Sequence, residues 1–177
     1  MGMRSLSFSR ELYIDREDFR EQAPSKFKRL VSGGEVRLRN AYVIRCDEVI
    51  KDSHGDVIEL RCSYDPDTLA KNPQGRKVKG VIHWVSARHG IEAEVRLYDR
   101  LFNHPSPDTA RDGTDYRDHL NPESLLTLTH CYLEPSLAGA RPGERFQFER
   151  EGYFCVDSEH SHDKPIFNRT VTLRDSW

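Results

Sequence analysis

The chain has 177 residues, of which 36% are hydrophobic and 32% charged, and its formal net charge is −2. This length allows one good-sized domain or two small ones, and the net charge argues against a protein that coats nucleic acid without specificity, because such proteins are usually basic. No run of about 18 apolar residues and no leader-like start is present, so we expect a cytoplasmic protein that does not enter a membrane.

The first predicted elements are a short helix and a strand. Asp15 is a candidate N-cap for a helix over residues 16–23, which Pro24 would end. Hydrophobic side chains then alternate over residues 36–45, which predicts one strand with an apolar face. The opposite face of this strand carries Arg37, Arg39 and Arg45.

A hairpin is expected to continue from this strand. Residues 52–56 have a composition typical of turns, and a second alternating run follows over residues 58–64. Residues 65–79 are rich in Asp, Asn, Pro, Gly and Lys, so we expect them to join two structural units.

The second half of the sequence continues the strand pattern. Residues 103–118 predict an exposed, mobile loop, and Asn121 followed by Pro122 indicates the start of a short helix. Further alternating runs cover residues 81–85, 92–97, 146–156 and 167–173.

Many short strands with polar turns favour a β-sandwich or a β-barrel. Because closure into a barrel removes exposed sheet edges, we expect an all-β fold of two small antiparallel β-barrels with a few short helices. The expected domains are residues 1–80 and 81–177, with an N-terminal strand that can cross between the barrels.

Signals for enzymes and metal sites are weak. The four cysteines, Cys46, Cys62, Cys131 and Cys155, form no CxxC pair, so we expect buried thiols rather than a zinc site or disulfides. His160 and His162 have a spacing that could ligate a metal, but no clear third ligand accompanies them, and we expect no metal. Motifs for nucleotide binding, zinc proteases and serine hydrolases are absent.

Charge is segregated along the chain. Residues 20–45 contain seven basic and two acidic residues, whereas residues 46–70 contain two basic and seven acidic residues. Such segregation can direct a nearly neutral protein to a polyanion. Two solvated faces are the alternative explanation.

Two segments have the side chains that RNA recognition requires, namely cations for phosphates, flat rings for stacking, and paired donors and acceptors for base edges. The first segment consists of Lys26, Phe27, Lys28 and Arg29, followed by Arg37 and Arg39. The second consists of Gln147, Glu149 and Arg150 between phenylalanines.

The second segment also fits an ordinary strand with Phe146 and Phe148 turned inward. Strict alternation then places Arg150 on the face opposite Gln147. These two side chains can share one pocket only if the strand bends or bulges, for instance near Gly152.

The amino-acid sequence resembles the carboxy-terminal half of bacterial glutaminyl-tRNA synthetases over nearly the whole chain. The phrases that carry this resemblance are EVRLRNAYVI at residues 35–44, GRKVKGVIHWVSA at 75–87, VRLYDRLF at 95–102, NPESL at 121–125, FQFEREGYF at 146–154 and FNRTVTLRD at 167–175.

This resemblance implies two L25-like antiparallel β-barrels, the first of them distal to the catalytic body, which bind the three unstacked anticodon bases of tRNA(Gln). It assigns the outer bases and their phosphates to Lys28, Arg29, Arg37 and Arg39, with Asn40 as a weaker candidate. It assigns the middle base, a uridine, to Gln147, Glu149 and Arg150.

The resemblance also implies that catalysis occurs elsewhere. ATP and Mg²⁺ would bind a catalytic domain upstream, so we expect no cofactor in this chain and no glutaminylation by the chain alone. The expected partner is the tRNA anticodon loop, without DNA or membrane binding, and the expected state is a monomer.

Two departures from the family pattern stand out. Lys26 occupies a position where the family usually has glutamine, which would turn a base contact into a phosphate contact. The family pocket also uses residues upstream of Met1, so we expect an incomplete surface. Two alternatives stay open: the anticodon-binding domain of an archaeal or eukaryotic-type glutamyl-tRNA synthetase, and a free-standing L25-like ribosomal RNA-binding protein.

Overall fold

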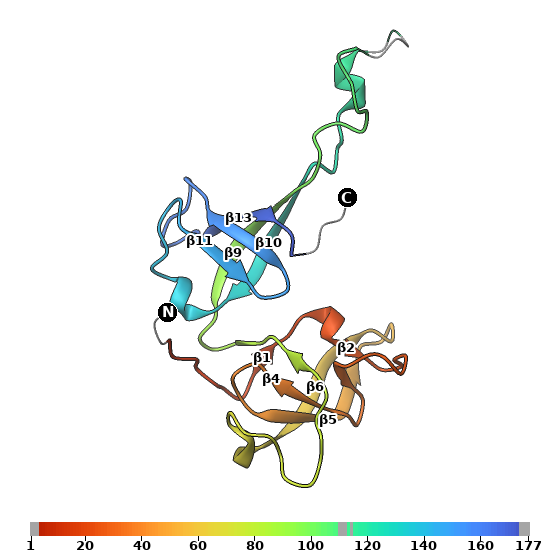
Figure 1. The fold of residues 1–177 in the computed structure, drawn as a ribbon, viewed down its shortest axis with the longest axis vertical. Coiled ribbons are helices and arrows are strands. Elements are labelled where there is room, and N and C mark those ends of the chain that lie inside the picture. Colours follow the sequence, from red (N-terminus) through yellow and green to blue (C-terminus); the bar gives the residue numbers. More distant parts are fainter. Residues whose placement is uncertain (1–3, 110–112, 114, 174–177) are drawn as a thin grey trace. The chain divides into compact units, whose positions relative to one another are not determined.

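The computed structural model describes residues 4–109, 113 and 115–173, and it is mostly β-structure (Figure 1). Within these residues the strands form four sheets, and each helix is a 3-10 helix of three or four residues. None of these helices is long and apolar enough to cross a membrane. The chain divides into an N-terminal unit, Leu6–His89, and a C-terminal unit, Met1–Ser5 with Gly90–Trp177.

The largest sheet of the N-terminal unit has the order β6-β5-β4-β7. Its strands are β4 (Glu35–Leu38), β5 (Val43–Lys51), β6 (Val57–Asp65) and β7 (Val81–Ile82). Strands β4, β5 and β6 are antiparallel neighbours, whereas β7 runs parallel to β4. Strand β6 is therefore an edge strand with one neighbour.

Two small sheets complete the N-terminal unit. Strand β1 (Leu12–Tyr13) pairs antiparallel with β8 (Val85–Ser86), and β2 (Phe19–Arg20) pairs in parallel with β3 (Leu30–Val31). The apolar core of the unit includes the fully buried side chains of Leu30, Val36, Leu38, Cys46 and Ile82.

The single strand predicted over residues 36–45 is wrong, because the chain reverses direction there. Strand β4 ends at Leu38 and β5 begins at Val43, with the Leu38 amide donating to the Tyr42 carbonyl oxygen at 2.9 Å. Asn40 adopts a left-handed conformation, φ 56°, which asparagine tolerates better than most residues. The predicted strand is thus a tight hairpin.

The helix predicted over residues 16–23 is also wrong. Only Arg16–Asp18 forms a 3-10 turn, η1, and the Asp15 side chain makes no capping hydrogen bond. Phe19 instead pairs with Leu30 in the β2–β3 sheet. Pairing with a distant segment therefore overrides the local helix signal.

The turn predicted at residues 52–56 is confirmed. The Asp52 carboxylate accepts hydrogen bonds from the amides of His54 and Asp56, each at 2.9 Å. Gly55 has φ 88°, and β5 and β6 pair on either side of the turn. The following 3-10 helix, η2, is Pro66–Thr68.

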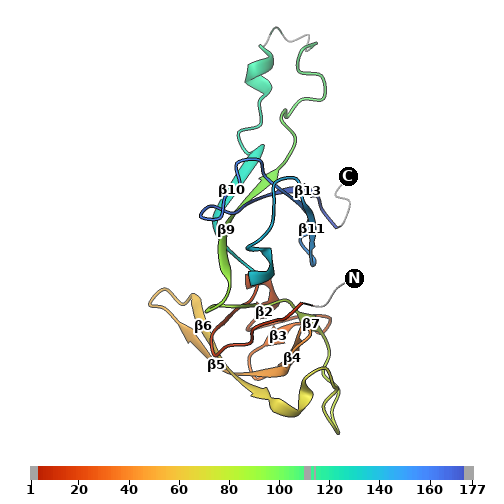
Figure 2. The ribbon, with the colours of Figure 1, turned by 90° about the vertical axis from the view of Figure 1, so that its left-hand side faces the viewer.

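One five-stranded sheet forms the framework of the C-terminal unit, in the order β10-β9-β13-β12-β11 (Figure 2). Its strands are β9 (Ile91–Tyr98), β10 (Leu125–Leu133), β11 (Arg145–Phe148), β12 (Gly152–Val156) and β13 (Ile166–Val171). Only the β13–β9 pair of this sheet is parallel. The core lies on one face and includes Val95, Phe154, Val156 and Phe167.

The run predicted as a strand over residues 146–156 is a hairpin. Strands β11 and β12 pair antiparallel, and residues 149–151 form the turn. Arg150 has φ 69° and Gly152 has φ 143°. A Cβ at Gly152 would lie 2.4 Å from the Val171 carbonyl oxygen, so only glycine fits this approach of the backbone of β12 to β13.

The connection between β9 and β10 contains the 3-10 helix η3 (Tyr116–His119), and η4 (Pro135–Leu137) follows β10. No helix starts at Asn121, whose side chain instead accepts a hydrogen bond from the Glu123 amide at 3.1 Å in a turn. Residues 110–112 and 114 of the predicted mobile loop lie outside the described residues.

Candidate RNA-binding site

Arg39 and Asn40 form the exposed turn between β4 and β5. The Arg39 amide donates to the Ile82 carbonyl at 2.9 Å, and the Trp84 indole donates to the Arg39 carbonyl at 2.9 Å. The backbone of the turn is therefore held by β7 and by the indole that follows it. A guanidinium and an amide on such a fixed turn are suited to binding phosphates and base edges.

An aromatic cluster supports this turn. Trp84 packs against Phe8, and Phe8 packs against Tyr42, with ring centroids 5.6 and 5.0 Å apart. Tyr64 completes the cluster at 5.2 Å from Tyr42. Edge-to-face contacts of this kind add to the burial energy of the rings and stiffen the base of the hairpin.

Arg37 is half-buried and binds main-chain carbonyls. Its Nη1 donates to the carbonyl oxygens of Ala41 and Thr68 at 3.0 and 2.8 Å, and its Nη2 donates to that of Lys71. The guanidinium thus ties the β4–β5 turn to the segment that follows β6. Its predicted contact with RNA stays a prediction, and the structure gives it a framework role that the alternation pattern did not indicate.

Arg29 compensates a buried carboxylate. Its Nε lies 3.2 Å from Asp18 Oδ1, and its Nη1 donates to the Glu17 carbonyl at 3.1 Å. The Asp18 side chain is fully buried, whereas Arg29 stays 36% exposed. Because a buried charge requires a partner, Arg29 stabilises the unit whatever else it binds.

The lysines of the same segment are exposed. Lys26 and Lys28 flank Phe27, and the Arg20 guanidinium lies 5.2 Å from the centroid of the Phe27 ring. A base that stacked on this ring would share it with the Arg20 cation. Lys28 remains available to bind phosphate.

Gln147, Glu149 and Arg150 lie on the β11–β12 hairpin of the C-terminal unit. Gln147 is exposed beside its partner Tyr153, while Phe148 stacks on Phe154 at 4.3 Å. Because residues 149–151 form the turn, strict strand alternation does not apply to Arg150. The alternation of a strand therefore does not require Arg150 to point away from Gln147.

Arg4 adds a cation close to this hairpin. Its Nε lies 2.7 Å from Glu134 Oε2, and this bond and the charge of Glu134 raise the pKa of Arg4. The charge of Glu149 raises that pKa further, so Arg4 and Glu149 interact. Residues so far apart in sequence gave no pattern from which this interaction could be predicted.

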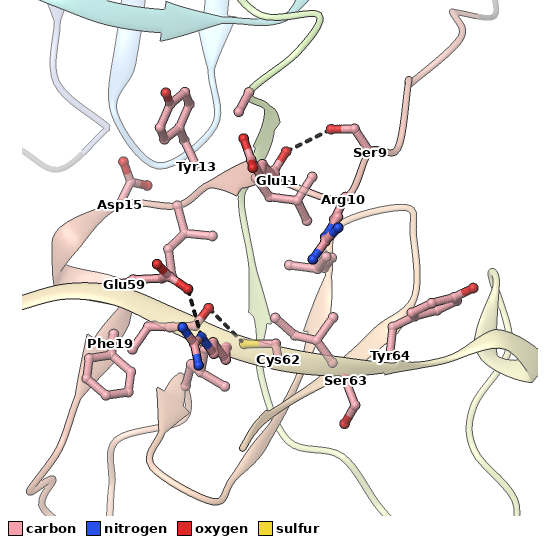
Figure 3. A pocket seen from close by; sticks show the side chains of 18 of the residues that line it. Ser9, Arg10, Glu11, Tyr13, Asp15, Phe19, Glu59, Cys62, Ser63 and Tyr64 are labelled. Atoms are coloured by element: carbon pink, nitrogen blue, oxygen red, sulfur yellow. Dashed lines mark hydrogen bonds and ion pairs between the residues drawn. The ribbon is translucent and has the colours of Figure 1, made fainter. Parts of the chain in front are cut away.

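A groove in the N-terminal unit lies between the β1 segment and the edge strand β6 (Figure 3). Tyr13 and Glu11 lie on one side of it, and Glu59, Cys62 and Tyr64 lie on the β6 side. None of the eight predicted RNA-binding residues lines this groove. The candidate site therefore lies outside this groove.

The prediction that all four cysteines are buried is wrong for three of them. Cys46 is buried as expected, but Cys62 on the edge strand is exposed, and Cys131 and Cys155 are only half-buried. An edge strand has one neighbour and shields fewer of its side chains. Among the described residues, no group of three or more His, Cys, Asp or Glu side chains could hold a metal ion.

Comparison with known proteins assigns the chain to a family. Residues 1–65 and 81–157 each match a family model described as tRNA synthetases class I (E and Q), anti-codon binding domain. The chain belongs to this family.

Several relatives of this anticodon-binding family are similar over the whole chain. Proteins named glutamine–tRNA ligase from Pseudomonas putida, Pseudomonas syringae pv. tomato and Ectopseudomonas mendocina are 64%, 63% and 64% identical over 178 residues. The matches cover 100% of this chain and 31%, 31% and 32% of those relatives. The chain thus spans about a third of the length of the curated relatives it matches.

Among the residues predicted for anticodon binding, the structure forms two local groups. Arg39 and Asn40 share one hairpin turn, and Gln147, Glu149 and Arg150 share another hairpin. These groups belong to different units. Convergence of the two groups on one RNA stays a prediction.

Proposed function

We propose that this chain binds the anticodon loop of tRNA(Gln) and supplies tRNA selection to an enzyme that attaches glutamine to tRNA with ATP. The observation that carries this proposal is the identity of 62–64% to glutamine–tRNA ligases across 100% of the chain. ATP and Mg²⁺ then act in a separate catalytic domain, in the cytoplasm, and the working state is a monomer.

In the N-terminal unit, Arg39 and Asn40 bind the outer anticodon bases. Their turn is fixed by the hydrogen bonds to Ile82 and Trp84, so little conformational entropy is lost when RNA binds. Lys28 binds the flanking phosphates. Arg29 and Arg37 bind them as well, through the N–H groups that are not used in their hydrogen bonds within the protein. Lysine suits this role because it binds phosphate as a compact charge with three donors.

In the C-terminal unit, the β11–β12 hairpin reads the middle base. A uridine edge offers one N–H donor between two carbonyl acceptors. The Glu149 carboxylate accepts from that N–H, while the Gln147 amide and the Arg150 guanidinium donate to the carbonyls. This arrangement favours uridine, because the corresponding edge of cytidine presents a donor where uridine has an acceptor.

We also propose that each unit is one small β-barrel, with the N-terminal unit distal and the C-terminal unit proximal to the catalytic body. The sheets and short pairs of the N-terminal unit and the five-stranded sheet of the C-terminal unit are consistent with such closure. The predicted limits of the two RNA-binding barrels, residues 1–80 and 81–177, differ from those of the two units, because β7 and β8 pair with strands of the N-terminal unit.

A glutamyl-tRNA synthetase domain is the second candidate, because the family description covers both E and Q enzymes. The 62–64% identity to glutamine–tRNA ligases favours tRNA(Gln) as the ligand. Membership of a synthetase family gives no support to the free-standing ribosomal protein.

Competition between purified tRNAs tests the proposal. Fluorescently labelled tRNA(Gln) bound to the chain should be displaced by unlabelled tRNA(Gln), and about tenfold less well by tRNA(Gln) whose middle anticodon base is changed, since a base-specific contact contributes about 1–3 kcal/mol. Equal displacement by tRNA(Glu) would favour the second candidate. Equal displacement by every tRNA would refute anticodon recognition.

A further inference from the structure

The segment of residues 76–80 is fixed at its first residue by ion pairs. The Arg76 Nε lies 3.1 and 3.0 Å from the two carboxylate oxygens of Glu35, and its Nη2 lies 2.6 Å from Asp65 Oδ2. The hydrogen bond from Arg76 holds the pKa of Asp65 below its ordinary value, so this carboxylate stays ionised and paired at neutral pH. Arg76 thereby pairs with acidic side chains on β4 and at the end of β6, and these two carboxylates share one cation.

Gly80 fixes the other end of the segment. Its carbonyl accepts a hydrogen bond from the Arg37 amide at 3.3 Å, and its φ is +96°. A Cβ at this position would lie 1.7 Å from the Lys28 carbonyl oxygen. Only glycine permits this approach, so the backbone of Lys28 rests directly on the segment.

Three exposed lysines belong to the two backbone segments that come together at Gly80. Lys77 and Lys79 lie between the two fixed ends, and Lys28 lies across Gly80. Among the described residues, none of the three ammonium groups forms an ion pair or a hydrogen bond. No described side chain therefore pairs with these ammonium groups, while the carboxylates of Glu35 and Asp65 already pair with Arg76.

The position of these lysines relates them to the candidate site. Leu38 pairs with Ile82 in the β4–β7 register, and the Arg39 amide donates to the Ile82 carbonyl. Ile82, which holds the Arg39–Asn40 turn, is thus two residues along the chain from Gly80. A nucleic-acid backbone that placed a base at this turn and continued along this segment would pass the lysines.

We propose that Lys77 and Lys79, together with Lys28, form a phosphate-binding strip that holds the tRNA backbone beside the Arg39–Asn40 turn. This inference rests on the proposed function. The strip binds phosphodiester charge without reading sequence, because each lysine binds phosphate as a compact point charge and phosphate contacts carry no sequence information. It adds affinity and fixes the register of the loop, while the hairpin turns supply specificity.

The test is the salt dependence of tRNA binding by the full chain with the double substitution Lys77→Gln and Lys79→Gln. Removal of one lysine–phosphate interaction should lower the slope of log K against log salt by about 0.7–0.9, so removal of two should lower it by about 1.5. The affinities for tRNA(Gln) and for tRNA(Gln) with a changed middle anticodon base should fall by the same factor. Lys77→Arg with Lys79→Arg should keep the parent slope.

A charge-matched control uses lysines that already have partners. Lys51 lies 2.8 Å from Glu21, and Lys164 lies 3.5 Å from Glu94. Lys51→Gln with Lys164→Gln removes the same formal charge and should leave the slope close to that of the parent. Circular dichroism of each variant checks that it is folded.

The outcomes separate the strip from the proposed function. A slope in the Lys77/Lys79 variant equal to that of the control, with discrimination between anticodons intact, overturns the strip and leaves the function standing. A lowered slope in a chain that binds all tRNAs alike supports the strip and contradicts anticodon recognition. Failure of the parent chain to bind any tRNA overturns both.

Discussion

Two arginines on one predicted strand face, Arg37 and Arg39, have different surroundings in the structure. Arg39 lies on an exposed turn, whereas Arg37 donates to three main-chain carbonyls. The sequence pattern treated them as equivalent because it reports only the face of a strand. It contains no information on carbonyl groups that η2 and the following turn bring within reach.

Arg37→Ala should lower the free energy of unfolding by about 2 kcal/mol, because the carbonyls of Ala41, Thr68 and Lys71 lose a charged donor. Urea denaturation of the parent and the variant measures this difference. Arg10→Ala is a suitable control, since Arg10 is an exposed arginine of the same unit without a side-chain hydrogen bond to another described residue. Stability equal to that of the control would show that these bonds contribute nothing.

Cys62 is an exposed residue, but its side chain lines the groove beside β6, and its thiolate is disfavoured. Burial of the thiol raises its pKa to about 12, and Cys46 and Asp47 disfavour the thiolate further. Because the pKa is raised, the thiol stays protonated until the pH approaches that value. At pH 8, alkylation of Cys62 by iodoacetamide should be roughly 10–100-fold slower than that of an ordinary exposed cysteine, the lower thiolate fraction outweighing its greater nucleophilicity.

Peptide mapping after timed alkylation measures this rate, with Cys62→Ser to identify the labelled peptide. The rate should still rise with pH above 9. A rate at pH 8 typical of an exposed thiol, or a titration midpoint near 8.5, would contradict the raised pKa.

At the scale of elements, three of the six alternating runs predicted single strands, and the other three span two strands each. The runs over residues 58–64, 92–97 and 167–173 correspond largely to β6, β9 and β13. The same pattern missed both tight hairpins for a geometric reason. Leu38 and Tyr42 flank one turn, and Phe148 and Gly152 flank the other.

Each of these flanking pairs is four residues apart, an even number, so hydrophobic alternation continues through the reversal without a break. The residues that mark the turns, Asn40 and Arg150, have positive φ angles without being glycine. Composition therefore indicated a bend near Gly152 but not a reversal of the chain at either place. The Asp52–Asp56 turn, in contrast, contains a glycine and two aspartates and was recognised.

An ion-pair network joins β9 to the turn after β12 in the C-terminal unit. The guanidinium of Arg96 lies 2.7 Å from Glu94, 3.3 Å from Asp157 and 3.0 Å from Glu159. The Arg96 hydrogen bond lowers the pKa of Glu94. The pKa of Asp157 is also lowered, mainly by the hydrogen bond from the Glu159 amide and next by the one from the Asn168 side chain.

The pH dependence of stability follows from these directions. A carboxyl group with a lowered folded-state pKa stabilises the fold above its unfolded pKa, about 4 for these residues, and this contribution is lost as the pH falls through the folded-state pKa. Thermal melts of the parent should therefore show a falling Tm from about pH 5 towards pH 3.

Arg96→Met should reduce the part of this slope that Glu94 contributes. Differential scanning calorimetry between pH 3 and 7 compares the two proteins on the transition of the C-terminal unit. Parallel curves for parent and variant would show that Arg96 is not the cause of the acid sensitivity.

At the scale of the whole molecule, the family and the mostly β architecture could be predicted from the sequence, because the resemblance covers nearly the whole chain. The candidate site could be predicted only in part. Lys28, Arg39, Asn40 and Gln147 are exposed as their roles require. The second role of Arg29, as the partner of buried Asp18, depends on the pairing of β2 with β3, which no local pattern reveals.

The central claim is that the two hairpins read anticodon bases, and a double-mutant cycle tests it most directly. Gln147→Ala is combined with replacement of the middle uridine of the tRNA(Gln) anticodon, and the dissociation constant of each of the four pairs is measured by titration. If Gln147 contacts this base, each single change should weaken binding by about tenfold or more, and the double change should add little, giving a coupling of about 1–3 kcal/mol. Fully additive losses, or no loss on Gln147→Ala, would contradict this account.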